Sequence, residues 1–191
     1  ARYFSGVAED GPASWQCTVR IANTTDICRA VAALDIDLGL VEGPSHVPGV
    51  DLQPWRTDEL VIVGAPTSAL AAAAARAPLG LPALRAATWL LREPSSGTRE
   101  TTDQWLLPRL GRYARSIELG SSEAIKHAAA AGLGIACLSR WVVGDLLARG
   151  ELRALPTRLG RLTRQCYWVR HPARVPTAAS TAFMQLLAAA P

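Results

Sequence analysis

The sequence predicts an α/β fold, and three observations carry this prediction. Stretches with the two-residue period of strands alternate along the chain with stretches of helical period. Hydrophobic residues make up 49% of the 191 residues, which is enough for a core and argues against disorder. Residues 36–44 are almost continuously apolar, as in a strand buried on both faces, and this predicts a parallel sheet with helices on each side.

The first predicted unit consists of a strand, a helix and a second strand. Residues 17–24 alternate in polarity and are rich in β-branched side chains, which predicts a strand. Residues 24–35 have the apolar spacing of a helix, with Thr24 or Thr25 as its N-cap. With the strand at 36–44, these residues are expected to form a β-α-β unit.

The rest of the chain continues the alternation. Strands are predicted at 59–64, 87–93, 115–121, 134–139 and 165–172. Helices are predicted at 68–78, 99–107, 121–134, 140–150 and 177–190. We expect Pro108 to limit the helix that precedes it, Ser121 or Ser122 to begin the next one, and Gly132 to stop that helix.

Charge and hydropathy argue against two classes of function. The net charge is +4, but only Lys126 is a lysine and the arginines are scattered, so we do not expect this segment to bind nucleic acid directly. No apolar run reaches the roughly 18 residues of a membrane span, so no membrane partner is expected. Residues 1–10 lack the layout of a signal peptide and look like the end of a helix, so we expect the chain to be part of a longer protein.

Catalytic and metal-binding motifs are absent from the sequence. The GxG of "GLGIAC" lies between a helix and a strand, the reverse of the order in a dinucleotide loop, and "SSGT" lacks the GK[ST] ending of a phosphate loop. There is no GxSxG or HExxH motif, so an enzyme is not favoured and no metal or cofactor is expected. The three histidines are expected at the surface or hydrogen-bonded: His46, His127 and His171.

The cysteines form no CxxC pair and have no zinc spacing. Cys17, Cys137 and Cys166 lie in apolar, strand-like stretches, which predicts small buried side chains. Together with Cys28 they are interpreted as reduced thiols of a cytoplasmic protein, and a redox pair is the alternative.

Hydroxyl-rich elbows between strands and helices are the strongest hint of a ligand site. They are "ANTTD" (22–26), "PSSGTRE" (94–100) and "GSSEA" (120–124), and "VEGP" (41–44) is a further strand end. Open α/β sheets bind ligands at the carboxyl ends of their strands, where helix N-termini offer unpaired N–H groups. The alternative is that each hydroxyl only caps its own helix.

Four segments resemble, in order and spacing, the effector-binding domain of LysR-type transcriptional regulators: "DIDLGLVEGP", "DELVIVGAP", "WLLREPSSGTRE" and "ELGSSEAIKHAAAAGLGIACLSR". The resemblance covers residues 17 to 190. It implies a periplasmic-binding-protein-like fold of two α/β subdomains joined by two crossing strands, with a ligand cleft between them. Subdomain I would comprise 1–63 and 164–191, and subdomain II 64–163, with the crossings near the stretches 64–68 and 156–164. The family's N-terminal strand and the start of its first helix are expected to be absent from this sequence.

The resemblance also implies a set of effector-binding residues. They are Thr24, Glu42, Gly43, Ser95, Ser96, Gly97, Thr98, Arg99, Ser121 and Ser122. Gly97 predicts either a positive φ or a close backbone approach by the ligand. Glu42 would repel an anionic effector unless Arg99 or another nearby arginine neutralises it.

By resemblance, the chain is expected to sense a small-molecule effector in the cytoplasm and to form a dimer, with a tetramer possible at full length. A winged helix-turn-helix upstream would bind DNA.

Ala124, Ala128 and Ala131 are a candidate dimer face, or else they pack against their own sheet. A transporter's solute-binding protein is the alternative function, and a small α/β enzyme is the third.

Overall fold

The structure is a computed structural model that describes residues 17–189. Its seven-stranded sheet has the order β1-β7-β2-β5-β3-β4, with β6 paired to β2. The strands are β1 (Gly39–Glu42), β2 (Asp51–Gly64), β3 (Thr88–Leu91), β4 (Arg115–Glu118), β5 (Ile135–Ser139), β6 (Arg153–Ala154) and β7 (Leu162–Arg170). The helices are α1 (Thr24–Ala32), α2 (Ala69–Ala74), α3 (Leu81–Ala86), α4 (Gly97–Leu110), α5 (Ser122–Ala130), α6 (Arg140–Ala148) and α7 (Ala178–Ala189).

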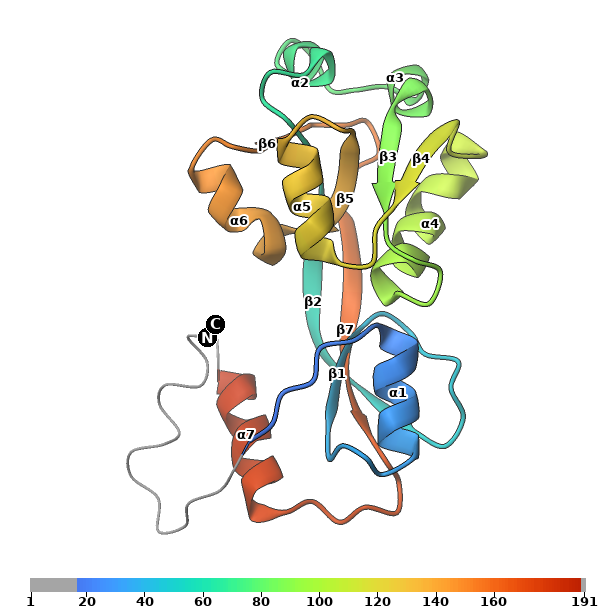
Figure 1. Cartoon of the computed structure of the whole chain (residues 1–191), viewed down its shortest axis with the longest axis vertical. Helices are drawn as coiled ribbons and strands as arrows, with labels where there is room; N and C mark the ends of the chain where they lie inside the picture. Colours follow the sequence, from blue (N-terminus) through green and yellow to red (C-terminus); the bar gives the residue numbers. More distant parts are fainter. Residues whose placement is uncertain (1–16, 190–191) are drawn as a thin grey trace.

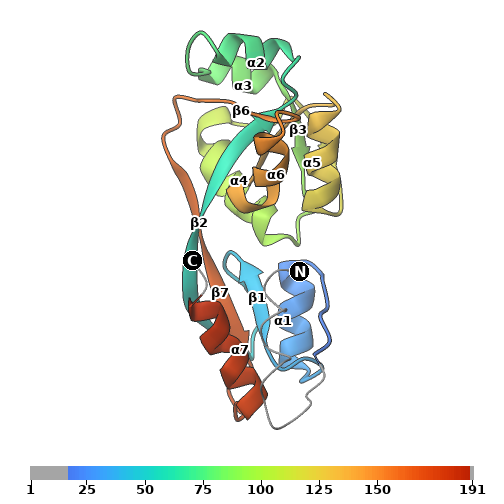
Figure 2. The same cartoon turned by 90° about the vertical axis from the view of Figure 1, so that its left-hand side faces the viewer.

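The elements fall into two lobes, and only β2 and β7 extend through both (Figures 1 and 2). The first lobe contains α1, β1 and α7, and the second contains α2 to α6 and β3 to β6. The predicted α/β class and the two crossing strands are therefore confirmed. The chain positions that divide the lobes, placed at 63/64 and 163/164 from the sequence, stay a prediction because β2 and β7 continue past them.

The second lobe has the larger core because helices cover both faces of its sheet. One cluster of buried side chains joins α3 and α4 to the sheet and includes Leu84, Trp89 and Leu106. The other joins α5 and α6 to the opposite face, through Ile125 and Val143 among others. The first lobe has a small cluster between α1, β1 and β7: Ile27, Cys28, Val31, Val41 and Val169.

The predicted β-α-β unit with a parallel sheet is wrong. Residues 17–23 are not a strand, and Ile21 is 94% exposed. A strand needs a neighbour to take its N–H and C=O groups, and the described residues offer none there. β1 does form, but it pairs antiparallel with β7 and leaves Leu40 38% exposed. Parallel pairing occurs in the second lobe, where β3 lies between β4 and β5.

Other differences concern the ends of elements. Pro108 lies inside α4 and does not limit it, and the helix continues to Leu110. Arg85 donates to the main-chain carbonyls of Arg109 and Leu110, which satisfies the end of that helix. The short α3 and β6 were not predicted. Gly132 does follow α5 with a φ of 82°, as expected of a helix stop.

The cysteines are unpaired, as expected, but Cys17 is exposed and not buried. Cys28, Cys137 and Cys166 are buried, and burial raises the pKa of Cys137 to about 12 and that of Cys166 to about 11. Residues 17–189 contain no cluster of side chains able to hold a metal ion. No helix within that range could cross a bilayer. The helix end expected at residues 1–10 lies outside the described residues.

Candidate functional site

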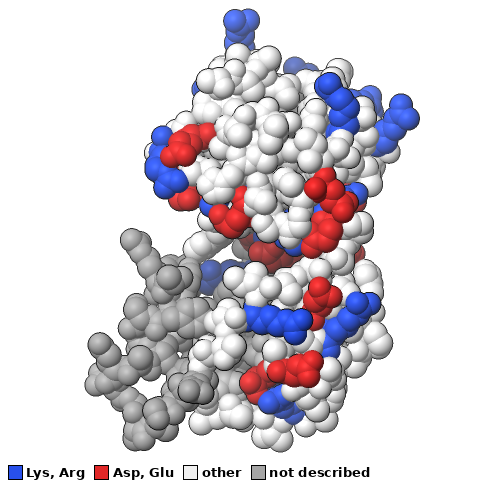
Figure 3. Space-filling view, in the orientation of Figure 1, with Lys and Arg blue, Asp and Glu red and all other residues white. Residues whose placement is uncertain are grey.

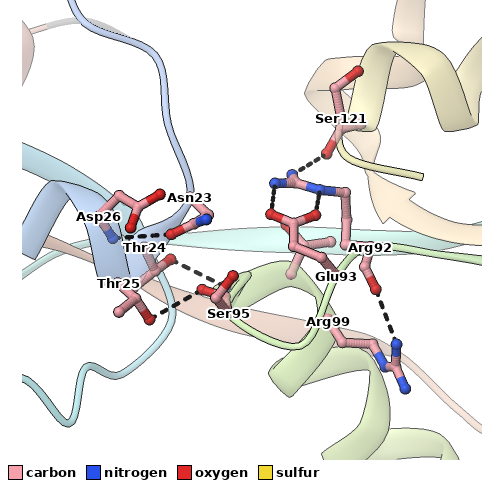
Figure 4. A network of polar contacts seen from close by, with 12 residues as sticks. Asn23, Thr24, Thr25, Asp26, Arg92, Glu93, Ser95, Arg99 and Ser121 are labelled. Atoms are coloured by element: carbon pink, nitrogen blue, oxygen red, sulfur yellow. Dashed lines mark hydrogen bonds and ion pairs between the residues drawn. The ribbon is translucent and has the colours of Figure 1, made fainter. Parts of the chain in front are cut away.

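The two lobes meet where the start of α4 lies against the start of α1 and the end of β1 (Figure 4). The hydroxyl of Thr24 accepts a hydrogen bond from the main-chain N–H of Gly97, at 3.1 Å. Thr25 donates from its hydroxyl and its main-chain N–H to the carbonyl oxygen of Ser95, at 3.3 and 3.4 Å. The elbows at 22–26 and 94–100 therefore bind each other across the lobes.

Capping of α1 leaves the hydroxyl of Thr24 available for this contact. Asn23, not Thr24 or Thr25, is the N-cap, and its side chain accepts from the N–H of Asp26. In α4 the N-cap is Ser96, but its side chain makes no capping hydrogen bond. Thr24 in the other lobe thus accepts from the first helical residue of α4, whose N–H has no partner within the helix.

The two glycines of the predicted site allow close contact between the lobes. A Cβ atom at Gly97 would lie 2.3 Å from the carbonyl oxygen of Glu42 and 2.6 Å from the hydroxyl of Thr24. Gly43 has a φ of 129°, and its Cβ would lie 3.2 Å from the carbonyl oxygen of Gly97. Gly97 is not among the residues with positive φ. Of the two reasons expected for this glycine, positive φ is wrong, and a close approach by a ligand stays a prediction. The close approach that the structure contains is by the chain's own main chain at Glu42.

A buried arginine links both lobes behind these glycines. The side chain of Arg164 on β7 is 2% exposed. Its Nε and Nη2 bind Oδ2 of Asp58, each at 2.8 Å, and its Nη1 donates to the hydroxyl of Thr98 at 2.8 Å. The same Nη1 lies 3.0 Å from Oε2 of Glu42. Thr98 donates to that same carboxylate oxygen at 2.9 Å, and Ser139 donates to Asp58 at 2.9 Å.

The electrostatics of this network favour the charged form of Arg164. Burial alone lowers the pKa of Arg164, but the negative charges of Glu42 and Asp58 outweigh it and raise that pKa above its ordinary value. The arginine that neutralises Glu42 is thus Arg164 and not Arg99. Arg99 instead binds Asp103 at 2.8 Å, and its Nη1 is 3.6 Å from Glu118.

A second cluster of polar side chains precedes the elbow at 94–100. Arg92 and Glu93 form a paired salt bridge with N–O distances of 2.7 and 2.8 Å, and Arg92 also donates to the hydroxyl of Ser122. Burial alone raises the pKa of Glu93, but hydrogen bonds from Arg92, from its own main chain and from Asn23 outweigh burial and lower that pKa. Ser121 caps its own helix by accepting from the N–H of Ala124.

A cavity with room for about one water molecule lies beneath the start of α4. Its polar lining comes from Arg92, Thr98, Arg99 and Thr102. Figure 3 shows acidic side chains along the boundary between the lobes. The junction is therefore narrow, polar and acidic at its rim.

The predicted site residues separate into two groups. Thr24, Glu42, Gly43, Ser95, Gly97 and Thr98 meet at the lobe junction, with Ser96 buried beside them. Arg99, Ser121 and Ser122 make contacts within the second lobe. The sequence reasoning missed Asp58, Ser139 and Arg164. Asp58 lies on the same buried face of its strand as Leu60, and Arg164 on the same buried face as Leu162. This two-residue spacing could have revealed both charged residues.

Comparisons with known proteins agree with this architecture. Residues 13–191 match the family model described as "LysR substrate binding domain". The chain is 46% identical over 151 residues to the "Uncharacterized HTH-type transcriptional regulator YeiE" of Escherichia coli K12, covering 79% of this chain and 50% of that protein. It is 28% identical over 169 residues to the "HTH-type transcriptional regulator CysL" of Bacillus subtilis, covering 88% and 56%. The chain thus spans about half the length of the curated relatives it matches.

Among solved structures, one similar chain is the Synechocystis CcmR regulatory domain in complex with 2-PG. The TM-score is 0.73 at 28% identity, over 87% of this chain and 79% of that one. The effector-binding domain of QuiR in complex with shikimate has a TM-score of 0.72 at 18% identity, over 87% and 77%. The latter similarity concerns the fold alone.

Proposed function

Because this chain belongs to the family of LysR substrate-binding domains, we propose that it is the effector-sensing part of a bacterial transcription regulator. A small molecule would bind between the lobes and change how the whole protein binds DNA. DNA binding would be the task of a winged helix-turn-helix outside this chain, in the cytoplasm. The domain itself would catalyse no reaction.

The match of residues 13–191 to one family is the observation that carries this proposal. The names of YeiE and CysL favour a regulator over a transporter's solute-binding protein, because both are HTH-type transcriptional regulators. The family is one of regulators rather than of enzymes, which argues against the α/β enzyme as well.

We place the effector at the lobe junction. The proposed contacts are the residues predicted from the sequence: Thr24, Glu42, Gly43, Ser95, Ser96, Gly97, Thr98, Arg99, Ser121 and Ser122. The division into 1–63 with 164–191 and 64–163 belongs to the same proposal. The first seven of these residues, Thr24 to Thr98, gather where the lobes touch, so a ligand there would contact both lobes. Such a ligand would shift the equilibrium between lobe arrangements only as far as it binds one of them more tightly.

A thermal-shift screen of small acids, amino acids and amines tests the proposal. A ligand at about 100 times its Kd adds about 2.7 kcal/mol of stability. The compound found should then alter operator binding by the full-length regulator. A full-length protein whose DNA affinity is the same with and without every stabilising compound would contradict the proposal.

We further propose that the domain self-associates through α5. Ala124 and Ala131 are exposed and Ala128 is half-buried, while Ile125 and Ala129 face the sheet. Small exposed residues allow helices to approach closely in a two-fold pair. Sedimentation of the full-length regulator should give at least a dimer, and Ala124→Glu should shift it toward monomer. A monomeric mass throughout the micromolar range would contradict this.

A further inference from the structure

We propose that Arg164 and Thr98 form a carboxylate-binding position that the chain fills with its own Glu42. The effector would then meet this end of the junction through a hydrogen-bond donor, an ammonium or hydroxyl group, and not through an acid. Only this second statement rests on the proposed function. Glu42 becomes the residue that decides which chemical class binds here.

Each side-chain nitrogen of Arg164 already has a partner. Nε and Nη2 bind Asp58, and Nη1 serves Thr98 and Glu42. The guanidinium is 2% exposed, so solvent does not compete for these groups. A carboxylate arriving from outside would have to displace one of the two that the chain supplies.

The one hydroxyl proton of Thr98 is in use as well. Its hydroxyl donates its one proton to Oε2 of Glu42 and accepts from Nη1 of Arg164. A hydrogen bond from Thr98 at 2.9 Å and an ion pair with Nη1 of Arg164 at 3.0 Å therefore meet at one carboxylate oxygen of Glu42. A guanidinium charge beside a hydroxyl donor would suit a ligand carboxylate in the same position.

The net charge of this network also disfavours an acidic ligand. Two carboxylates, Glu42 and Asp58, share one guanidinium, so the group carries a net charge of −1. A third carboxylate would be repelled, whereas a cation or a neutral donor would be attracted. The side chain of Glu42 is 47% exposed, so a ligand can reach it from solvent although Arg164 is buried.

Chemical rescue tests the carboxylate position. Glu42→Ala removes the internal carboxylate and leaves the two donors in place. Formate should then raise the Tm of this variant above its value in chloride at equal ionic strength, by about 2 °C at three times the formate Kd. Wild type should show no formate-specific shift.

Two further variants separate vacancy from loss of charge. Glu42→Gln fills the position with an amide, so formate should not rescue it. Glu100→Ala removes another carboxylate at the lobe contact, one that binds His46 at 3.1 Å and does not contact Arg164, so it should not respond to formate either. Should Glu42→Ala fail to fold in chloride, recovery of its circular dichroism in formate is the rescue.

Rescue that is absent in Glu42→Ala, or equal in wild type and Glu100→Ala, would overturn the carboxylate position. For the effector class, the compound found in the screen should lose about tenfold or more in affinity in Glu42→Gln, because a charged hydrogen bond is lost. Unchanged or tighter binding overturns that part. Rescue needs neither effector nor DNA, so it can succeed even if the regulator function fails.

Discussion

The second lobe contains two serine-rich elbows of similar sequence, "PSSGT" before α4 and "GSSEA" before α5, and they behave differently. Ser121 in the second elbow caps its own helix. Ser96 in the first does not cap α4 by its side chain, and the N–H of Gly97, the first helical residue, donates to Thr24 of the first lobe. The second elbow thus forms the local cap that the sequence allowed, and the first forms a contact between the lobes.

The difference shows that an unsatisfied helix start marks a contact better than its hydroxyl content does. A helix that caps itself has no need of a partner at that donor, whereas one without a side-chain cap leaves N–H groups to be satisfied from elsewhere. At α4 the partner is the other lobe. The stability of the domain and the relative position of its lobes are therefore coupled at the first elbow and separate at the second.

The largest expected effect comes from adding one methyl group to the first elbow. Gly97→Ala places a Cβ against the main chain of Glu42, so the lobes must separate or the end of β1 must shift. We expect a loss of about 1–3 kcal/mol in the free energy of unfolding and an expanded radius of gyration. Urea denaturation and small-angle scattering measure the two.

Gly120→Ala is the matched control, because no atom lies within 4 Å of a Cβ at Gly120. Its free energy of unfolding should stay within about 0.5 kcal/mol of wild type. Equal effects of the two alanine variants would remove the distinction between the elbows.

A smaller effect is expected from Thr98→Val, which deletes the hydroxyl between Arg164 and Glu42 but keeps the shape. The loss should be about 1–2 kcal/mol in the free energy of unfolding, since two hydrogen bonds of a buried group disappear. Thr98→Ser retains the hydroxyl and should recover most of it. If denaturation finds valine and serine equally stable, the hydroxyl contributes nothing to the junction.

The smallest effect belongs to the second elbow. Ser121→Ala removes a helix cap and should cost about 1 kcal/mol of stability. Effector binding should weaken as well, because Ser121 is also one of the proposed effector contacts. Calorimetric titration that finds unchanged affinity in Ser121→Ala would leave the helix cap as its role and remove Ser121 from the proposed contacts.

The sequence was sufficient for elements that rest on local pattern and flanking residues. α1, α5 and β5 appear where periodicity predicts them, and α5 has its predicted cap at Ser121, although Asn23 and not Thr24 or Thr25 caps α1. Residues 17–23 have the pattern of a strand but lack a neighbour among the described residues, and a strand is defined by its neighbour. Pro108 is tolerated in α4 because its position is exposed and Arg85 satisfies the carbonyls at the helix end.

The site was only half predictable for a related reason. Hydroxyls and glycines mark the elbows, but the sequence does not tell that their partners are in the other lobe. Asp58 and Arg164 are separated by 106 positions and become a pair only when β2 lies beside β7. Each is a charged residue on the buried face of an apolar strand. Because an unpaired buried charge is costly, each predicts a partner of opposite charge.

The continuity of β2 and β7 also bears on how such domains can be recombined. Leu60 and Leu162 face each other in the β2–β7 ladder, so the chain enters and leaves most of the second lobe at neighbouring points. Everything from α2 to β6 lies between those two positions. One exchange of that segment between relatives would transplant half of the junction as a unit. A hybrid assembled in this way would keep Thr24, Glu42 and Arg164 from one parent and receive Thr98 from the other, so its fitness would depend on whether the two halves of the hydrogen-bond network match.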